Sequence, residues 1–197
     1  MVGEKNMETE ITVQVYDKID DIIKILESKG FKVTKEYTMI DYYYSKYDLE
    51  QLKKMTYQAL IVNSFLLRNI ITDKESCELC YKNKIIKDNV VVSEQKQTTK
   101  IDSFKNAVKI FENSGITMWC EVQNHSFVYR KSGICFALQI IKDLGVFIEY
   151  EEDSTMQNLS TSKKIERMKE IVNSLGLKLG NDYSEKKVYR LFKNSNK

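Results

Sequence analysis

The chain has 197 residues, of which 42% are hydrophobic and 30% are charged, and its formal net charge at pH 7 is +3. This composition is typical of a globular protein and excludes wholesale disorder. The small net charge argues against a dedicated nucleic-acid-binding protein, and the longest apolar runs are too short to span a membrane. The first ten residues lack the apolar stretch of a secretory signal and there are only four cysteines, so we expect reduced thiols and a cytoplasmic protein.

Three segments have apolar residues at helical spacing and then reach a glycine. They are residues 20–31, 103–116 and 164–177, with the glycines Gly30, Gly115 and Gly176. Glycine is the residue that most readily adopts the left-handed conformation of a helix C-terminal cap. The sequence therefore predicts three amphipathic helices, each ended by a glycine.

Between these helices the apolar residues recur with period two. Ile11, Val13 and Val15 alternate with polar residues, and residues 146–151 alternate in the same manner. Further strands are expected at residues 39–44, 65–71, 77–82, 85–93, 126–130 and 134–140. Tight turns are expected at Asp88-Asn89 and Ser132-Gly133.

The order of these elements predicts an α+β protein. It contains two related halves, each with a strand, a helix and antiparallel strands, followed by a terminal helix. No shift of composition marks a linker. We therefore expect one domain over residues 1–197, with its core at about residues 8–192.

Three glutamates and two cations stand out on the expected strands. Glu149 and Glu151 are two positions apart, so their side chains share a face at a spacing of roughly 7 Å. On an open face they are an ordinary polar edge, whereas on an enclosed face they need a hard cation such as Mg²⁺. Glu10, on the first strand, allows the same two interpretations. Arg68 and Lys82, on apolar strands, suit either phosphate binding or surface salt bridges.

The cysteines and the single histidine give weaker indications. Cys77 and Cys80 form a C-x-x-C pair, but on a strand they point to opposite faces, so one zinc ion could hardly bind both. We expect buried thiols instead. His125 has no companion for a catalytic triad or a histidine metal site, and we expect it to have a hydrogen-bonded structural role.

The order of these features resembles the CYTH superfamily, named for class IV adenylate cyclase and thiamine triphosphatase, over nearly the whole chain. The family motifs E-x-E-x-K, D-x-Y-F-D, L-R-I-R and T-Y-K correspond to residues 10–14, 41–45, 67–70 and 80–82. The family element L-D-x-V-x-x-L-G-x-F-x-E-x-E corresponds to residues 138–141 and 144–151, and it is the most specific of the matches.

The resemblance implies an eight-stranded antiparallel β tunnel, or barrel, with flanking helices and a C-terminal helix. In the family, basic residues of the tunnel bind a triphosphate and glutamates hold Mg²⁺ or Mn²⁺. Carried over by position, the metal ligands are Glu10, Glu149 and Glu151, and the phosphate-binding residues are Arg68 and Lys82.

Two further residues extend this implied site. Glu94 matches a family glutamate on the strand after the hairpin. Arg130 is a cation that could replace a missing one, as could Lys84 and Lys131.

Several motif positions depart from the family pattern. Neutral residues stand where the family has charged ones: Thr12, Gln14, Ile70, Asn124, Ser126 and Gln139. Each lost cation removes a charge-assisted contact of roughly 1.5–3 kcal/mol. Such losses weaken the affinity for a triphosphate or change the ligand.

The resemblance implies binding of a small-molecule triphosphate: a nucleotide, thiamine triphosphate or inorganic tripolyphosphate. The activity would be that of a metal-dependent adenylate cyclase or triphosphatase, and the overall pattern, especially in the C-terminal half, favours the branch that resembles class IV adenylate cyclase. One alternative is a catalytically weakened module that senses a nucleotide or another polyanion, and another is a structural or partner-binding domain. We expect a monomer or a homodimer, with neither nucleic acid nor a membrane as partner.

Overall fold

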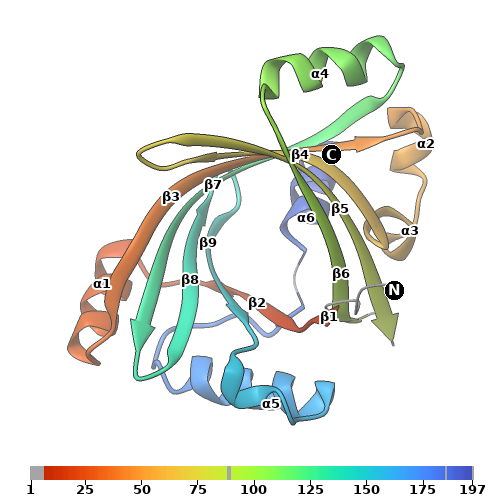
Figure 1. Ribbon diagram of the computed structural model, residues 1–197. Helices are drawn as coiled ribbons and strands as arrows, with labels where there is room; N and C mark the ends of the chain where they lie inside the picture. Colours follow the sequence, from red (N-terminus) through yellow and green to blue (C-terminus); the bar gives the residue numbers. More distant parts are fainter. Residues whose placement is uncertain (1–6, 88–89, 185, 197) are drawn as a thin grey trace. The chain divides into compact units, whose positions relative to one another are not determined.

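The structure is a computed structural model that describes residues 7–87, 90–184 and 186–196 (Figure 1). The described strands are β1 (Met7–Glu8), β2 (Glu10–Val15), β3 (Lys32–Ser45), β4 (Asn63–Ile71), β5 (Glu75–Lys87), β6 (Val90–Ile101), β7 (Thr117–Lys131), β8 (Ile134–Ile141) and β9 (Gly145–Glu151). The helices are α1 (Ile19–Ser28), α2 (Leu49–Lys53), α3 (Tyr57–Ile61), α4 (Phe104–Asn113), α5 (Thr161–Asn173), α6 (Lys187–Asn194) and a 3₁₀ turn, η1 (Ser154–Met156).

The chain divides into two compact units, both of them discontinuous in sequence. Unit 1 contains the described residues within 1–7, 38–124 and 186–197, and unit 2 contains residues 8–37 and 125–185. The long strands β3 and β7 each contribute one part to unit 1 and the other part to unit 2.

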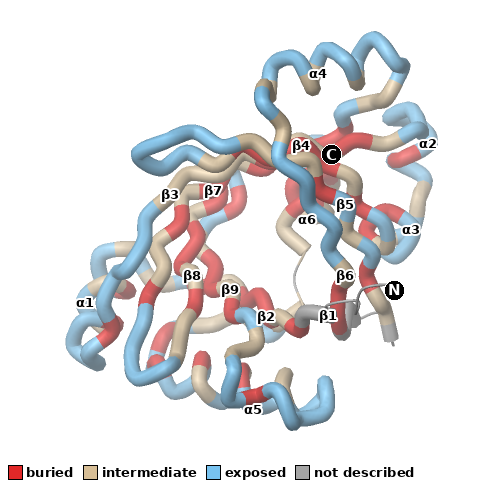
Figure 2. Tube along the Cα trace, viewed as in Figure 1, coloured by how far each residue is buried: buried red, intermediate tan, exposed pale blue. Residues whose placement is uncertain are grey.

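In unit 2, antiparallel strands carry one apolar face and one polar face. β9 pairs with β2 on one side and with β8 on the other. The apolar face packs against α1 and α5, and this core includes Ile11, Val13, Val15, Leu138, Ile148 and Tyr150 from the strands and Ile22, Leu26, Met168 and Val172 from the helices. Figure 2 shows the buried segments along β2, β8 and β9. Because side chains alternate along a strand, Glu10, Glu149 and Glu151 belong to the opposite, polar face.

Unit 1 has helices on both faces of its antiparallel strands. On one face α4 packs through Phe111, whose ring centroid lies 4.8 Å from that of Tyr44 and 5.0 Å from that of Phe65. Tyr43 belongs to the other face, where its ring meets Trp119 at 5.7 Å. Trp119 in turn contacts Phe192 of α6 at 5.1 Å. The C-terminal helix α6 therefore packs on the face that α4 leaves uncovered.

The expected fold class is confirmed. The described chain is α+β, its strands pair antiparallel, and it has flanking helices and a C-terminal helix. The three expected helices are α1, α4 and α5, and their glycines Gly30, Gly115 and Gly176 all have positive φ angles, between 71° and 82°. The expected turn at Ser132-Gly133 also has two positive φ angles, as a type I′ turn requires.

Other elements differ from the sequence-based expectation. The strands expected at residues 77–82 and 85–93 are wrong in their boundaries, because β5 runs without a break over residues 75–87. The turn expected at Asp88-Asn89 lies outside the described residues. The strands expected at residues 39–44 and 126–130 are the C-terminal parts of the much longer strands β3 and β7. In β3 the charged segment 32–36 also joins the sheet.

Gly176 allows a direct test of the cap geometry. Its φ is +73° and a Cβ built there would contact nothing within 4 Å, so Gly176→Ala adds backbone strain without a clash. We expect the free energy of unfolding to fall by about 1–2 kcal/mol, measured by urea denaturation. The matched control is Gly180→Ala, whose added Cβ would make ordinary contacts of 3.6 Å or more; its effect should stay below about 1 kcal/mol. Equal losses would contradict the strain argument.

Candidate functional site

Three glutamates predicted as metal ligands gather on the polar face of unit 2. In the pairing of β2 with β9, Glu10 lies directly opposite Glu151, while Glu149 lies opposite Thr12. Each glutamate offers one carboxylate oxygen, and these three oxygens lie within 4.8 Å of one another. Glu10 and Glu149 are half-buried and Glu151 is exposed. The strand register therefore brings together all three residues singled out in the sequence.

The chemistry of this cluster fits a hard divalent cation. Carboxylate oxygens are the ligands that Mg²⁺ and Mn²⁺ prefer, and three negative charges at this spacing repel one another unless a cation offsets them. Gln139, which is 1% exposed, donates a hydrogen bond from Nε2 to Oε1 of Glu149 at 3.2 Å. A neutral donor behind a carboxylate orients it without neutralising it.

Two polar residues of β2, Thr12 and Gln14, were singled out as departures from the motif that the sequence resembles, and both have defined surroundings. Thr12 is buried at 2% exposure. Gln14 Nε2 donates to the backbone oxygen of Leu144, at 3.2 Å, in the turn that leads into β9. Gln14 therefore stabilises this turn, whereas a lysine at its position would bring a positive charge.

The two predicted phosphate-binding cations lie in unit 1, and both are ion-paired. Arg68 faces Asp41 across the β3–β4 pair, with Nε and Nη2 donating to the two carboxylate oxygens at 2.7 Å each. Burial by itself lowers the pKa of Arg68, but the adjacent Asp41 carboxylate outweighs burial, so the pKa lies well above its usual value. The guanidinium therefore stays charged. Its Nη1 group lies outside this two-point contact.

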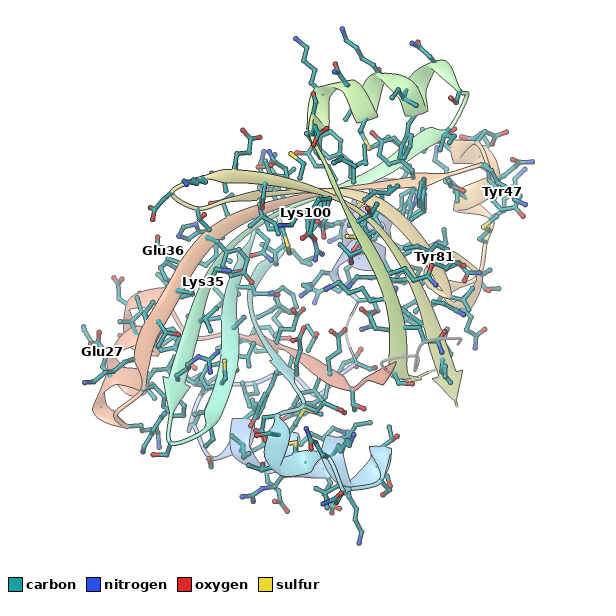
Figure 3. The ribbon with its side chains drawn as sticks, in the orientation of Figure 1. Glu27, Lys35, Glu36, Tyr47, Tyr81 and Lys100 are labelled. Carbon is teal, nitrogen blue, oxygen red and sulfur yellow. The ribbon has the colours of Figure 1, made fainter. Side chains whose placement is uncertain are left out.

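The second cation, Lys82, belongs to a chain of polar contacts on the same face. Its Nζ lies 2.9 Å from Oε1 of Glu94. Oε2 of Glu94 lies 3.9 Å from Nζ of Lys84, which donates to Oγ of Ser64 at 2.8 Å. Tyr81, next to Lys82 on β5, points to the other face, where its exposed ring is seen in Figure 3. Glu94 therefore contacts Lys82, one of the predicted phosphate-binding residues.

Tyr43 connects the two ion pairs electrostatically. Its pKa is raised, first by burial and then by the negative charge of Asp41, while Lys82 and Arg68 act in the opposite direction and Glu94 adds to the increase. Tyr43 therefore stays protonated at neutral pH. All of these side chains project from one face because cross-strand partners, and residues two apart, share a face.

Two further residues discussed in the sequence analysis, Arg130 and His125, belong to unit 2. Arg130 is exposed near the end of β7 in unit 2, next to Lys131, whose ammonium lies 5.7 Å from the ring centroid of Phe31. Nε2 of His125 lies 3.0 Å from Oε1 of Glu36, which agrees with the expected structural role.

The sequence gave no indication of a role for Asp41 or Ser64. Asp41 could have been noticed, because it is the first residue of the segment that resembles the D-x-Y-F-D motif. Its pairing with Arg68, however, depends on the register between β3 and β4.

All four cysteines are free thiols, as expected. Cys77 contacts Asn69 and Cys80 contacts Thr98, so the C-x-x-C pair does point in two directions. Cys80 and Cys120 are buried, whereas Cys77 and Cys135 are half-buried.

Comparison with known proteins supports the fold. No protein-family model matches the sequence, and no curated protein matches it. Solved structures do match: the PH1012 protein of Pyrococcus horikoshii OT3 has a TM-score of 0.70 and 18% identity, covering 93% of this chain and 98% of that one. A Vibrio parahaemolyticus protein described as a candidate adenylate cyclase has a TM-score of 0.65 and 15% identity, covering 96% and 99%.

A third matching structure carries a described activity. It is HpAC1 from Hippeastrum, a candidate adenylyl cyclase described as having a dominant triphosphatase activity, with a TM-score of 0.59, 13% identity and coverage of 95% and 96%. At these identities the comparisons show the fold alone. Within the described ranges, no helix combines the length and the apolar character needed to span a bilayer.

The thiol environments predict an order of alkylation. Burial, followed by the nearby Glu121, raises the pKa of Cys120 to about 12, and burial also raises the pKa of Cys80. Because only the thiolate reacts, we expect iodoacetamide at pH 8 to modify Cys77 and Cys135 at least about tenfold faster than the other two, measured by peptide mass spectrometry. In denaturant all four rates should converge. Equal rates in the native protein would contradict this assignment.

Proposed function

We propose that this chain is a CYTH-type protein whose two units belong to one domain, and that it binds a small-molecule triphosphate together with Mg²⁺ or Mn²⁺. The shared fold with proteins described as cyclases or as a triphosphatase supports the proposal. The observation that carries it is the convergence of Glu10, Glu149 and Glu151, whose carboxylate oxygens lie within 4.8 Å of one another.

The roles of the residues follow from their chemistry. The three glutamates would hold the cation, which would offset phosphate charge and orient the attacking oxygen. Gln139 keeps the Glu149 carboxylate in position through its hydrogen bond. Arg68 and Lys82 bind phosphate oxygens, Arg68 through the Nη1 group that lies outside its pair with Asp41.

The attacking oxygen determines the reaction. If it is water, the protein is a triphosphatase, and if it is a ribose 3′-hydroxyl, the protein is an adenylate cyclase. Both reactions use the same cation and the same phosphate-binding groups. For this reason we propose the ligand class and the cation, with tripolyphosphate and ATP as the first substrates to test.

A second candidate function is a catalytically weakened module that binds a polyanion without turnover. This function is favoured because the candidate phosphate-binding cations are already paired with carboxylates of the protein. Within these ion pairs three positive charges, on Arg68, Lys82 and Lys84, meet two negative charges, on Asp41 and Glu94, so most of the cationic charge is already balanced. The half-buried Glu78 lies opposite Arg68 on the neighbouring strand and adds a further negative charge. A weakly positive site attracts a polyanion less strongly than a fully cationic one.

The metal site predicts the effect of two substitutions. Glu149→Gln and Glu151→Gln remove one carboxylate charge each with little change of shape. We expect each to lower Mn²⁺-dependent hydrolysis of tripolyphosphate or ATP at least about tenfold, measured by phosphate release, and to reduce the thermal stabilisation by Mn²⁺. The matched control is Glu166→Gln, an exposed glutamate on α5 of the same unit, which should behave as the wild type.

The outcomes separate the candidate functions. Turnover that depends on Glu149 and Glu151 supports the enzyme, and saturable binding without turnover supports the polyanion-binding module. Turnover unchanged in both variants contradicts the metal site. Neither binding nor turnover at millimolar tripolyphosphate and ATP contradicts the proposal as a whole.

A further inference from the structure

Glu94 is a buried acid held between two lysines. Its side chain is 3% exposed, and its two carboxylate oxygens point to different ammonium groups: Oε1 to Lys82 at 2.9 Å and Oε2 to Lys84 at 3.9 Å. The backbone positions explain this geometry, because Glu94 lies directly opposite Lys84 in the β5–β6 pair, and Lys82 is two residues away on the same face. A single carboxylate therefore bridges both cations.

This bridge resembles the contact that a phosphate group would make. A phosphate also offers oxyanion oxygens that different cations can bind at the same time. A lysine ammonium is a compact point charge, so an anion beside it needs the right distance rather than a particular orientation. The Glu94 carboxylate therefore occupies positions beside the two lysines that phosphate oxygens would need.

One of the two carboxylate oxygens of Glu94 lacks a hydrogen bond. Oε2 of Glu94 is buried and accepts no hydrogen bond from any residue that the structure describes, and the contact with Lys84 at 3.9 Å is longer than a hydrogen bond. Lys84 instead donates to Ser64 at 2.8 Å. A buried acceptor without a donor destabilises the arrangement that contains it. A ligand that displaces the Glu94 carboxylate from the lysines replaces a strained contact, not an ideal one.

The pair formed by Asp41 and Arg68 is different. Both oxygens of Asp41 accept hydrogen bonds at 2.7 Å from one edge of the guanidinium, so this pair is complete and geometrically fixed. It holds the planar guanidinium in one orientation. Asp41 is therefore a positioning residue for Arg68. Asp41 and Glu94 therefore carry the same charge and are equally buried, but their ion pairs have different geometries.

We propose that Glu94 is an internal counter-anion that competes with a ligand phosphate for Lys82 and Lys84, and that Lys84 is thereby a third phosphate-binding residue. This inference rests on the proposed binding of a triphosphate. Its consequence is that the protein lowers its own affinity for polyphosphates through Glu94, while Asp41 supports the binding.

The two acids should therefore respond to neutralisation with opposite signs. Glu94→Gln removes the competing charge, and we expect the Kd for tripolyphosphate with Mg²⁺ to decrease at least about tenfold, measured by isothermal titration calorimetry. Asp41→Asn removes an equal charge from an equally buried site but loosens Arg68, so its Kd should increase or stay unchanged. Lys84→Gln should increase the Kd about tenfold or more.

The control variant distinguishes competition from a general gain of positive charge. If Asp41→Asn tightens binding as much as Glu94→Gln, net charge explains the effect and the inference is wrong. It is also wrong if Glu94→Gln leaves the affinity unchanged or weakens it. Circular dichroism establishes that each variant is folded. Should Glu94→Gln fail to fold, Glu94→Asp retracts the carboxylate from the lysines and is expected to tighten binding by a smaller factor.

Failure of this inference differs from failure of the proposed function. If the wild type binds tripolyphosphate and Glu94→Gln does not tighten the binding, only the inference fails. If neither the wild type nor Glu94→Gln binds at millimolar concentration, the proposed ligand class fails as well. Binding that is detectable only in Glu94→Gln supports competition by Glu94, while it contradicts the proposed function of the wild type under these conditions.

Discussion

The antiparallel register between β2 and β9 is the constraint on which unit 2 depends. It places Ile11 and Tyr150 among the side chains that pack against α1 and α5, and it places Glu10 opposite Glu151 on the other face. A slip of one residue would exchange the two faces and bury the glutamates in an apolar core. The hydrophobic core and the acidic cluster are therefore two results of the same strand pairing.

Unit 1 meets a different physical requirement, because its polar face contains buried charges. An unpaired buried cation would cost several kcal/mol, so Arg68, Lys82 and Lys84 need acceptors whether or not a ligand is bound. Asp41 and Glu94 supply them. If an anionic ligand binds these cations, as we propose, the acids that already balance them also influence which anions can bind.

Local sequence patterns predicted much of the fold. The apolar stripes of residues 20–31 and 164–177 became α1 and α5, since helical periodicity needs only neighbours three or four positions away. The predictions failed where no such pattern exists. Residues 32–36 are exposed and largely polar, and they belong to β3 through pairing rather than burial. The five-residue helices α2 and α3 are too short to show a periodicity.

For the candidate site, the sequence by itself determined that Glu149 and Glu151 share a face and that Arg68 and Lys82 lie on strands, because alternation along a strand is a local property. Only the tertiary structure decided that Glu10 stands opposite Glu151, that Asp41 fixes Arg68, and that Glu94 bridges two lysines. These contacts join residues on different strands. Their register is set by the packing of whole faces and turns, which no short stretch of sequence contains.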